Sequence, residues 1–173
     1  MTRFAHRALL VLAIVITIGC DRVTKHLAIT TLAGTLGRTF AGDMIRFEYV
    51  ENTGGFLSLG ASLPLGLRTS LFTFGTGVLL LAVVGVALRY RWSGWSLLGL
   101  ALFVAGGASN WVDRFARGKV VDFVSVGVGP LRTGIFNVAD VAILAGAIIV
   151  VVSELWPEAD APSSPDPVRD RVS

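Results

Sequence analysis

Charged residues are scarce in this chain, and cysteine and histidine are almost absent. Only 16% of the 173 residues are charged, whereas a soluble domain has about 25%. Hydrophobic residues make up 53%. The length suits one domain, and the composition excludes a disordered chain, a collagen and a soluble nucleic-acid binder. The sequence therefore indicates an integral membrane protein.

The few sulfur and imidazole groups limit the chemistry that the chain can perform. A single cysteine, Cys20, excludes an internal disulfide and a cysteine-rich zinc site. Two histidines, His6 and His26, disfavour a histidine-based metal site. We expect no metal, no cofactor and no nucleic-acid partner. Any chemistry must come mostly from oxygen and nitrogen side chains.

Long apolar runs dominate the sequence. A bilayer core requires about 20 apolar residues per helix. Two runs reach this length without a charge, but the first and the last runs reach it only by including Asp21 and Asp140. The sequence predicts four transmembrane helices, over about residues 8–29, 69–88, 92–112 and 135–156. A carboxylate at membrane depth marks a candidate functional site, although both acids could equally lie at the interface and end their helices.

Basic residues give a mixed indication of the orientation. Arg89 and Arg91 lie in the short turn between the middle spans, and Arg3 and Arg7 precede the first span. They favour a cytoplasmic location for both termini and for this turn. The opposite loops also contain arginines, so charge alone does not decide the orientation.

The segments between the spans are long enough to form structure of their own. Residues 44–51 alternate apolar and polar side chains, which predicts a strand, and residues 52–55 read as a turn. A second apolar run, residues 120–128, could pair with the first strand in a small sheet at the membrane surface. The segment 157–173 is rich in proline, serine and aspartate, which predicts a disordered tail.

The first span could instead be a cleaved signal. Small residues before Cys20 resemble a lipoprotein cleavage site. However, Thr17 is a poor residue at that site, and the helical pattern continues through Ile29. We therefore expect a retained helix in which Cys20 is a small buried residue.

Several polar residues stand out, and each also has a structural interpretation. Asp21 and Lys25 are four residues apart, so they lie on one helix face. They could act in catalysis or form an ion pair that positions the helix. Asn52, next to Gly54, suits either a site or an ordinary turn. The densest group follows the third span and contains Asn110, Asp113 and Arg114.

Asp122 and Asp140 are each flanked by apolar residues, which suits partial burial. Two carboxylates held close together cannot both ionise easily, so one can accept a proton while the other donates one. Alternatively, Asp122 pairs with Arg114 or Arg117, and Asp140 caps the fourth helix. Asn137, one turn before Asp140, could orient its carboxylate. A serine–lysine protease using Lys25 with Ser58 or Ser109 is conceivable, but no spacing supports it.

Four blocks of this sequence resemble those of lipoprotein signal peptidase, also called signal peptidase II. They cover about residues 10–150 and follow the order of that family. The blocks are Asp21 to Lys25, Glu51-Asn52-Thr53-Gly54, the segment from Ser109 to Phe123, and Phe136 to Asp140. The sequence differs from the family pattern in two places. Only Gly55 separates Gly54 from Phe56, where the family usually has two small residues. Ser109 stands where the family often has glycine.

The resemblance implies an aspartic endopeptidase of the bacterial cytoplasmic (inner) membrane. Such enzymes remove the signal peptide from diacylglyceryl-modified prolipoproteins by cutting just before the lipidated cysteine. Asp122 and Asp140 match the catalytic pair of the family, and Asp113 is assigned a structural role. Positions that support the site or bind substrate match Asp21, Lys25, Asn52, Gly54, Asn110, Arg114 and Asn137.

The family also implies a mainly helical fold, with four transmembrane helices, a small extracytoplasmic β-cradle and a short surface helix. Residues 1–156 would form the peptidase domain, with the cradle in about 34–63 plus 113–134 and the tail 157–173 in the cytoplasm. Both termini would be cytoplasmic and the active site near the outer face. Implied partners are lipidated prolipoproteins, membrane lipids and globomycin-type inhibitors, and we expect a monomer.

Two rival functions remain to be compared with this one. A small four-span transporter or channel could use Asp21 and Asp140 for ions, although its loops should then be short. An inactive scaffold would have no reason to retain both Asp122 and Asp140.

Overall fold

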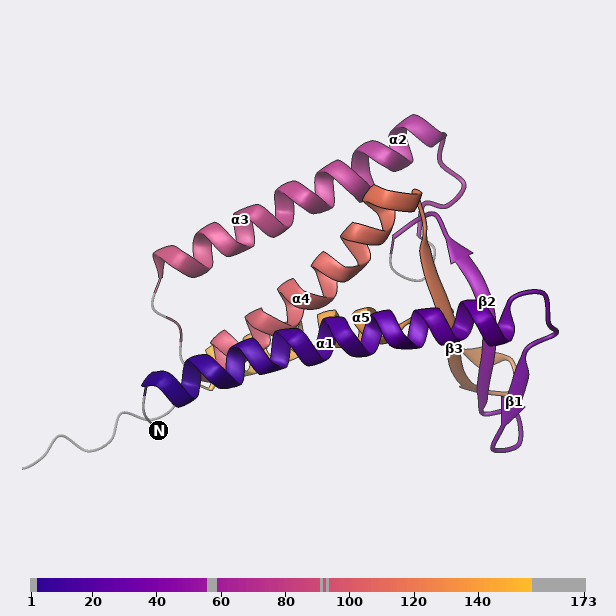
Figure 1. Cartoon of the computed structure of the whole chain (residues 1–173), viewed down its shortest axis with the longest axis horizontal. Coiled ribbons are helices and arrows are strands. Elements are labelled where there is room, and N and C mark those ends of the chain that lie inside the picture. The colour runs from indigo at the N-terminus through magenta and orange to yellow at the C-terminus, as the bar shows by residue number, and fades with distance from the viewer. Residues whose placement is uncertain (1–2, 56–58, 91, 93, 157–173) are drawn as a thin grey trace, which may run out of the picture.

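Helices make up most of the molecule, and a small sheet lies at one end of them (Figure 1). The computed structural model describes residues 3–55, 59–90, 92 and 94–156, with side chains from residue 7 onward. The predicted tail 157–173 and Ser58 lie outside the described residues. The end of the molecule away from the sheet contains the start of α1, the end of α3 and the start of α4 (Figure 1).

Helix α1 extends from Arg3 to Leu32 and has a buried stripe along one side. The buried residues recur every three or four positions, which places them on one helical face. They are Thr17, Asp21, Lys25, Ala28 and Leu32. Cys20 lies beside this stripe and is exposed, so the expectation of a buried cysteine is wrong.

The sheet confirms the predicted pairing of two distant segments. Strand β2 (Ile45–Asn52) runs antiparallel to β3 (Val120–Val128), with Val50 opposite Asp122 and Asn52 opposite Val120. Two short edge strands that the sequence did not predict complete the order β1-β2-β3-β4: β1 (Arg38–Phe40) and β4 (Leu131–Arg132). Val121 and Phe123 pack on Ala28 and Leu32, which fixes the sheet to the end of α1.

The second apolar run begins earlier than predicted. A short helix α2 (Leu65–Thr69) follows Pro64 and continues through a π-helical turn η2 (Ser70–Gly75) into α3 (Thr76–Arg89). Proline suits this position because the first helical turn needs no amide donor. Among the described residues, no short surface helix stands apart from the long helices.

Helices α4 (Gly94–Arg117) and α5 (Val138–Leu155) form the closest helix pair. Glycines allow this approach: a Cβ added at Gly106 would lie 2.5 Å from the carbonyl oxygen of Ala139, and one at Gly99 would lie 2.8 Å from that of Gly146. Small residues have this role between membrane helices generally. Helix α4 continues past the predicted end of its span, so Asp113 and Arg114 are helical.

Within the described ranges, three helical segments are long and apolar enough to cross a membrane. They are Leu65–Arg89, Gly94–Arg117 and Val138–Leu155. Helix α1 is not among them, and its apolar run is interrupted by Asp21, Arg22 and Lys25. The fold is thus a mainly helical membrane protein with a small antiparallel sheet.

Candidate active site

Asp122 and Asp140 come from different elements and lie in one buried polar cluster. Asp122 is on β3, where it is 1% exposed, and Asp140 is in the first turn of α5, where it is 7% exposed. The short loop between β4 and α5 brings both to the same level because Phe136 pairs with Val124 in an isolated bridge. This pairing places the start of α5 against β3.

Asn137 connects the two carboxylates. Its side-chain amide donates to Asp122 Oδ1 at 2.6 Å, and its backbone N–H donates to Asp140 Oδ2 at 3.1 Å. Its side-chain oxygen accepts the backbone N–H of Asp140 at 3.0 Å, which completes a capping box at the start of α5. One residue therefore caps the helix and orients both acids.

Two more asparagines occupy the remaining carboxylate oxygens. Asn52 donates to Asp122 Oδ2 at 2.7 Å, and Asn110 donates to Asp140 Oδ1 at 2.9 Å. Asn52 also shapes the predicted turn, because its side-chain oxygen accepts the N–H of Gly54 at 2.9 Å. Asn52 therefore stabilises the turn and contacts Asp122 at the same time.

Among the described residues, no arginine or lysine forms an ion pair with Asp122 or Asp140. Arg114 instead donates twice to the carbonyl oxygen of Gly54, at 2.7 and 3.2 Å, and Arg117 donates to Asp113. The alternative in which Asp122 pairs with Arg114 or Arg117 is therefore wrong. The alternative role of Asp140 as a cap is confirmed, but this role coexists with its position beside Asp122.

A second set of charges lies beneath the carboxylate pair and is internally neutralised. The Lys25 ammonium lies 2.8 Å from both Asp21 Oδ2 and Asp113 Oδ2, and it donates to Asn110 Oδ1 at 2.7 Å. Asp113 also accepts from Arg22 at 2.5 Å. Since Asn110 contacts both Lys25 and Asp140, this ion cluster reaches the carboxylate pair through one amide.

Asp21 fixes the start of α5 against α1 and α4. Its Oδ1 accepts the backbone N–H of Ala139 at 3.0 Å, and its Oδ2 accepts the Ser109 hydroxyl at 2.6 Å. A carboxylate at a helix N-terminus is stabilised by the unpaired N–H groups there. Ser109 is thus bound to Asp21, and no hydrogen bond joins it to Lys25 in the described part of the chain.

Asp122 is buried, which disfavours its charged form. Burial raises the pKa of Asp122 above its ordinary value, and the hydrogen bonds from Asn52 and Asn137 offset part of this effect. Two buried carboxylates in one cluster resist ionising together. Such a pair can accept a proton from water and return one to a leaving group.

The sequence did not single out Arg22, which binds Asp113 and the carbonyl oxygen of Ser109 at 2.6 Å. Its position next to Asp21 was the only signal available. Apart from Ser58, the residues that the sequence indicated for the site are described and lie in this region. Within the described residues, no group of three histidine, cysteine, aspartate or glutamate side chains could hold a metal ion.

Apolar helices and a buried carboxylate pair together define a membrane protein equipped for acid–base hydrolysis. A family model described as signal peptidase (SPase) II matches residues 13–156. The chain therefore belongs to the signal peptidase II family, and it is a peptidase that removes signal peptides from prolipoproteins. The alternative of a transporter or channel has no support from these comparisons.

Individual relatives agree with this assignment. The chain is 35% identical over 156 residues to a lipoprotein signal peptidase of Mycobacterium leprae, covering 83% of this chain and 69% of that protein. It is 36% identical to one of Rhodococcus jostii, covering 86% and 73%. A solved bacterial membrane enzyme shares the fold with a TM-score of 0.75 at 21% identity, over 90% of this chain and 94% of that one.

Proposed function

We propose that the chain cleaves diacylglyceryl-modified prolipoproteins just before the lipidated cysteine, with Asp122 and Asp140 as the catalytic pair. The observation that carries this proposal is the bridge formed by Asn137, which holds one oxygen of each carboxylate. The arrangement fits an aspartic peptidase because two acids in one buried cluster share their protons. No metal or cofactor enters the proposed reaction.

The reaction follows from the two acids. One carboxylate removes a proton from a water molecule as the water oxygen attacks the scissile carbonyl carbon. The other acid protonates the nitrogen of the lipidated cysteine as the peptide bond breaks. Amides from Asn52, Asn110 and Asn137 hold the carboxylates in place throughout.

The remaining polar residues have supporting roles in this proposal. Lys25 and Asp21 set the positions of Asn110 and of the start of α5. Arg114 fixes the buried Gly54, and thereby the turn that presents Asn52 to Asp122. Asp113 neutralises the cations on α1 and α4, so we assign it a structural role.

We further propose that α1 is a fourth span and that both termini lie in the cytoplasm. Large apolar side chains of α1 point away from the protein, as lipid-facing residues do; they include Leu9, Val11, Leu12, Val15 and Ile16. The sheet then forms the cradle at the outer face of the inner membrane, next to the catalytic pair. Residues 1–156 form the peptidase domain, and the protein is a monomer. Globomycin-type inhibitors bind at Asp122 and Asp140.

A gel-shift assay on a lipidated prolipoprotein in detergent tests the catalytic pair. We expect Asp122→Asn and Asp140→Asn each to lower turnover by about 10²–10⁴-fold, because each removes one acid–base group. Asp43→Asn is the matched control, since Asp43 lies in the turn between β1 and β2, where its side chain is 42% exposed and pairs with Arg46. Globomycin should block the wild type and the control. Full turnover by both site variants, with folding intact, would refute the assignment.

A further inference from the structure

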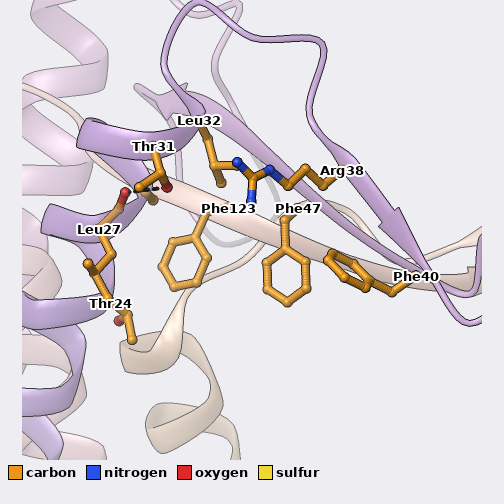
Figure 2. A pocket seen from close by; sticks show the side chains of 9 residues that line it. Thr24, Leu27, Thr31, Leu32, Arg38, Phe40, Phe47 and Phe123 are labelled. Carbon is orange, nitrogen blue, oxygen red and sulfur yellow. Dashed lines mark hydrogen bonds between the residues drawn. The ribbon is translucent and has the colours of Figure 1, made fainter.

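An apolar groove of about 270 Å³ lies between the end of α1 and the sheet. Figure 2 shows the rings of Phe123, Phe47 and Phe40 in a row, with Thr24, Leu27 and Thr31 beside them. The Phe40 and Phe47 rings meet edge to face, with centroids 5.6 Å apart. The sequence alone indicated no binding role for these side chains.

The threonines that line the groove donate their hydroxyl groups to their own helix. Thr24 donates its hydroxyl to the carbonyl oxygen of Cys20 at 2.7 Å, and Thr31 donates to that of Leu27 at 2.7 Å. Hydroxyl groups satisfied by their own helix offer little to a polar ligand. The walls of the groove therefore suit a hydrocarbon chain.

Arg38 is the only charged residue among the described residues that line the groove. Its guanidinium extends over the row of rings towards Leu32 (Figure 2). No ion pair or hydrogen bond joins the Arg38 side chain to any other described residue, whereas Arg46 and Arg132 on the same sheet both bind Asp43. An exposed cation without a protein partner, at the border of an apolar groove, complements an anionic group attached to a hydrocarbon chain.

The groove is separate from the catalytic pair. Successive side chains of a strand point to opposite faces. Phe123 faces the groove and packs against Ala28 and Leu32, so the neighbouring Asp122 faces the other side of the sheet. A ligand in the groove therefore does not occupy the space between the two acids.

We propose that this groove binds an anionic phospholipid, with one acyl chain along the phenylalanine rings and its phosphate at Arg38. The lipid attached to the proposed substrate is a less suitable occupant, because a diacylglyceryl group has no charge to pair with Arg38. The groove continues into exposed apolar residues of α1, namely Val23 and Leu27, which opens it to surrounding lipid. The bound lipid would link β1 to α1 and hold the sheet against the membrane.

Native mass spectrometry of the full chain in neutral detergent tests this site. Dioleoyl phosphatidylglycerol and dioleoyl phosphatidylcholine are added separately, and the bound fraction is measured for each. We expect the wild type to prefer phosphatidylglycerol by about fivefold, the contribution of one basic residue near an anionic headgroup. Arg38→Gln should abolish this preference. Arg46→Gln is the matched control, because it removes the same charge from the same sheet, and it should retain the preference.

A second variant tests the hydrocarbon part of the site. Thr31→Phe fills the groove but keeps Arg38, so it should reduce binding of both phospholipids. Equal binding of the two phospholipids by the wild type, or an unchanged preference in Arg38→Gln, would overturn the proposal. Dioleoylglycerol that displaces phosphatidylglycerol at equal concentration would also overturn it and would favour the lipid of the substrate. Displacement by inorganic phosphate alone would show a simple anion site instead.

Discussion

At the residue scale, the arrangement of amides around two acids is the main feature of this peptidase. Three asparagines occupy all four carboxylate oxygens of Asp122 and Asp140, and the nearest cations are engaged elsewhere. Neutral donors orient an acid without holding it in the charged form as strongly as an ion pair does. The amides thus hold both acids in position without an ion pair, as the proposed reaction requires.

The two functions of Asn137 can be separated by substitution. Serine is also a good N-cap but cannot reach across to Asp122, whereas alanine does neither. We expect Asn137→Ser to keep the thermal stability and to lose about 100-fold in turnover. Asn137→Ala should lose the same turnover and also about 1 kcal/mol of stability. Thermal unfolding and the gel-shift assay measure the two effects, and full activity of the serine variant would contradict the bridging role.

The raised pKa of Asp122 predicts a pH effect on stability. The folded protein binds this proton more tightly than the unfolded chain, whose pKa lies near 3.8. The stabilisation that protonated Asp122 gives the folded state is therefore complete below that value. It is lost as the pH rises through the higher pKa of the folded state. Asp122→Asn does not titrate, so its stability relative to the wild type should increase over this pH range. Unfolding in detergent at a series of pH values measures the difference, and a constant difference would contradict the prediction.

At the scale of elements, the position of the acids depends on how closely α4 and α5 approach. Gly106 contacts the backbone at Ala139, directly before Asp140. We expect Gly106→Ala to cost about 1–3 kcal/mol of stability, because the added methyl group separates the helices. Turnover should fall as well, since Asn110 and Asp140 lie on opposite sides of this contact.

The control for this prediction is a glycine in an open position. Gly85 lies on α3, where an added Cβ would have no neighbour within 4 Å. Gly85→Ala should be neutral or should stabilise the helix by up to about 1 kcal/mol. If both alanine variants behave alike in thermal unfolding and in turnover, helix spacing does not control the site.

The sequence anticipated the elements better than their ends. Alternation of apolar residues correctly predicted β2 and its pairing with β3, because one face of this sheet packs on α1. It missed β1 and β4, which have two or three residues each and no measurable period. The end of α4 was placed too early, since the ion pairs of Asp113 allow the helix to continue beyond the apolar run.

At the scale of the whole molecule, the proposed orientation makes a direct prediction. In a Cys20→Ser background, Leu131→Cys lies at the sheet and Tyr90→Cys at the connection between α3 and α4, and both native positions are exposed. A membrane-impermeant maleimide should label the cysteine at position 131 in intact spheroplasts. It should label the one at position 90 only after permeabilisation. The reverse pattern would place the active site on the cytoplasmic side.

The sequence by itself determined the class of this protein, the three apolar helices found among the described residues and the polar residues that the structure brings together. Apolar content and local spacing are properties of residues close together in the sequence, so they can be recognised without a structure. Only the tertiary structure decided which partner each polar group has. Asp21 contacts Ala139 across 118 positions, and Asn52 contacts Asp122 across 70. Such hydrogen bonds depend on packing that brings distant segments within about 3 Å, and no local pattern specifies them.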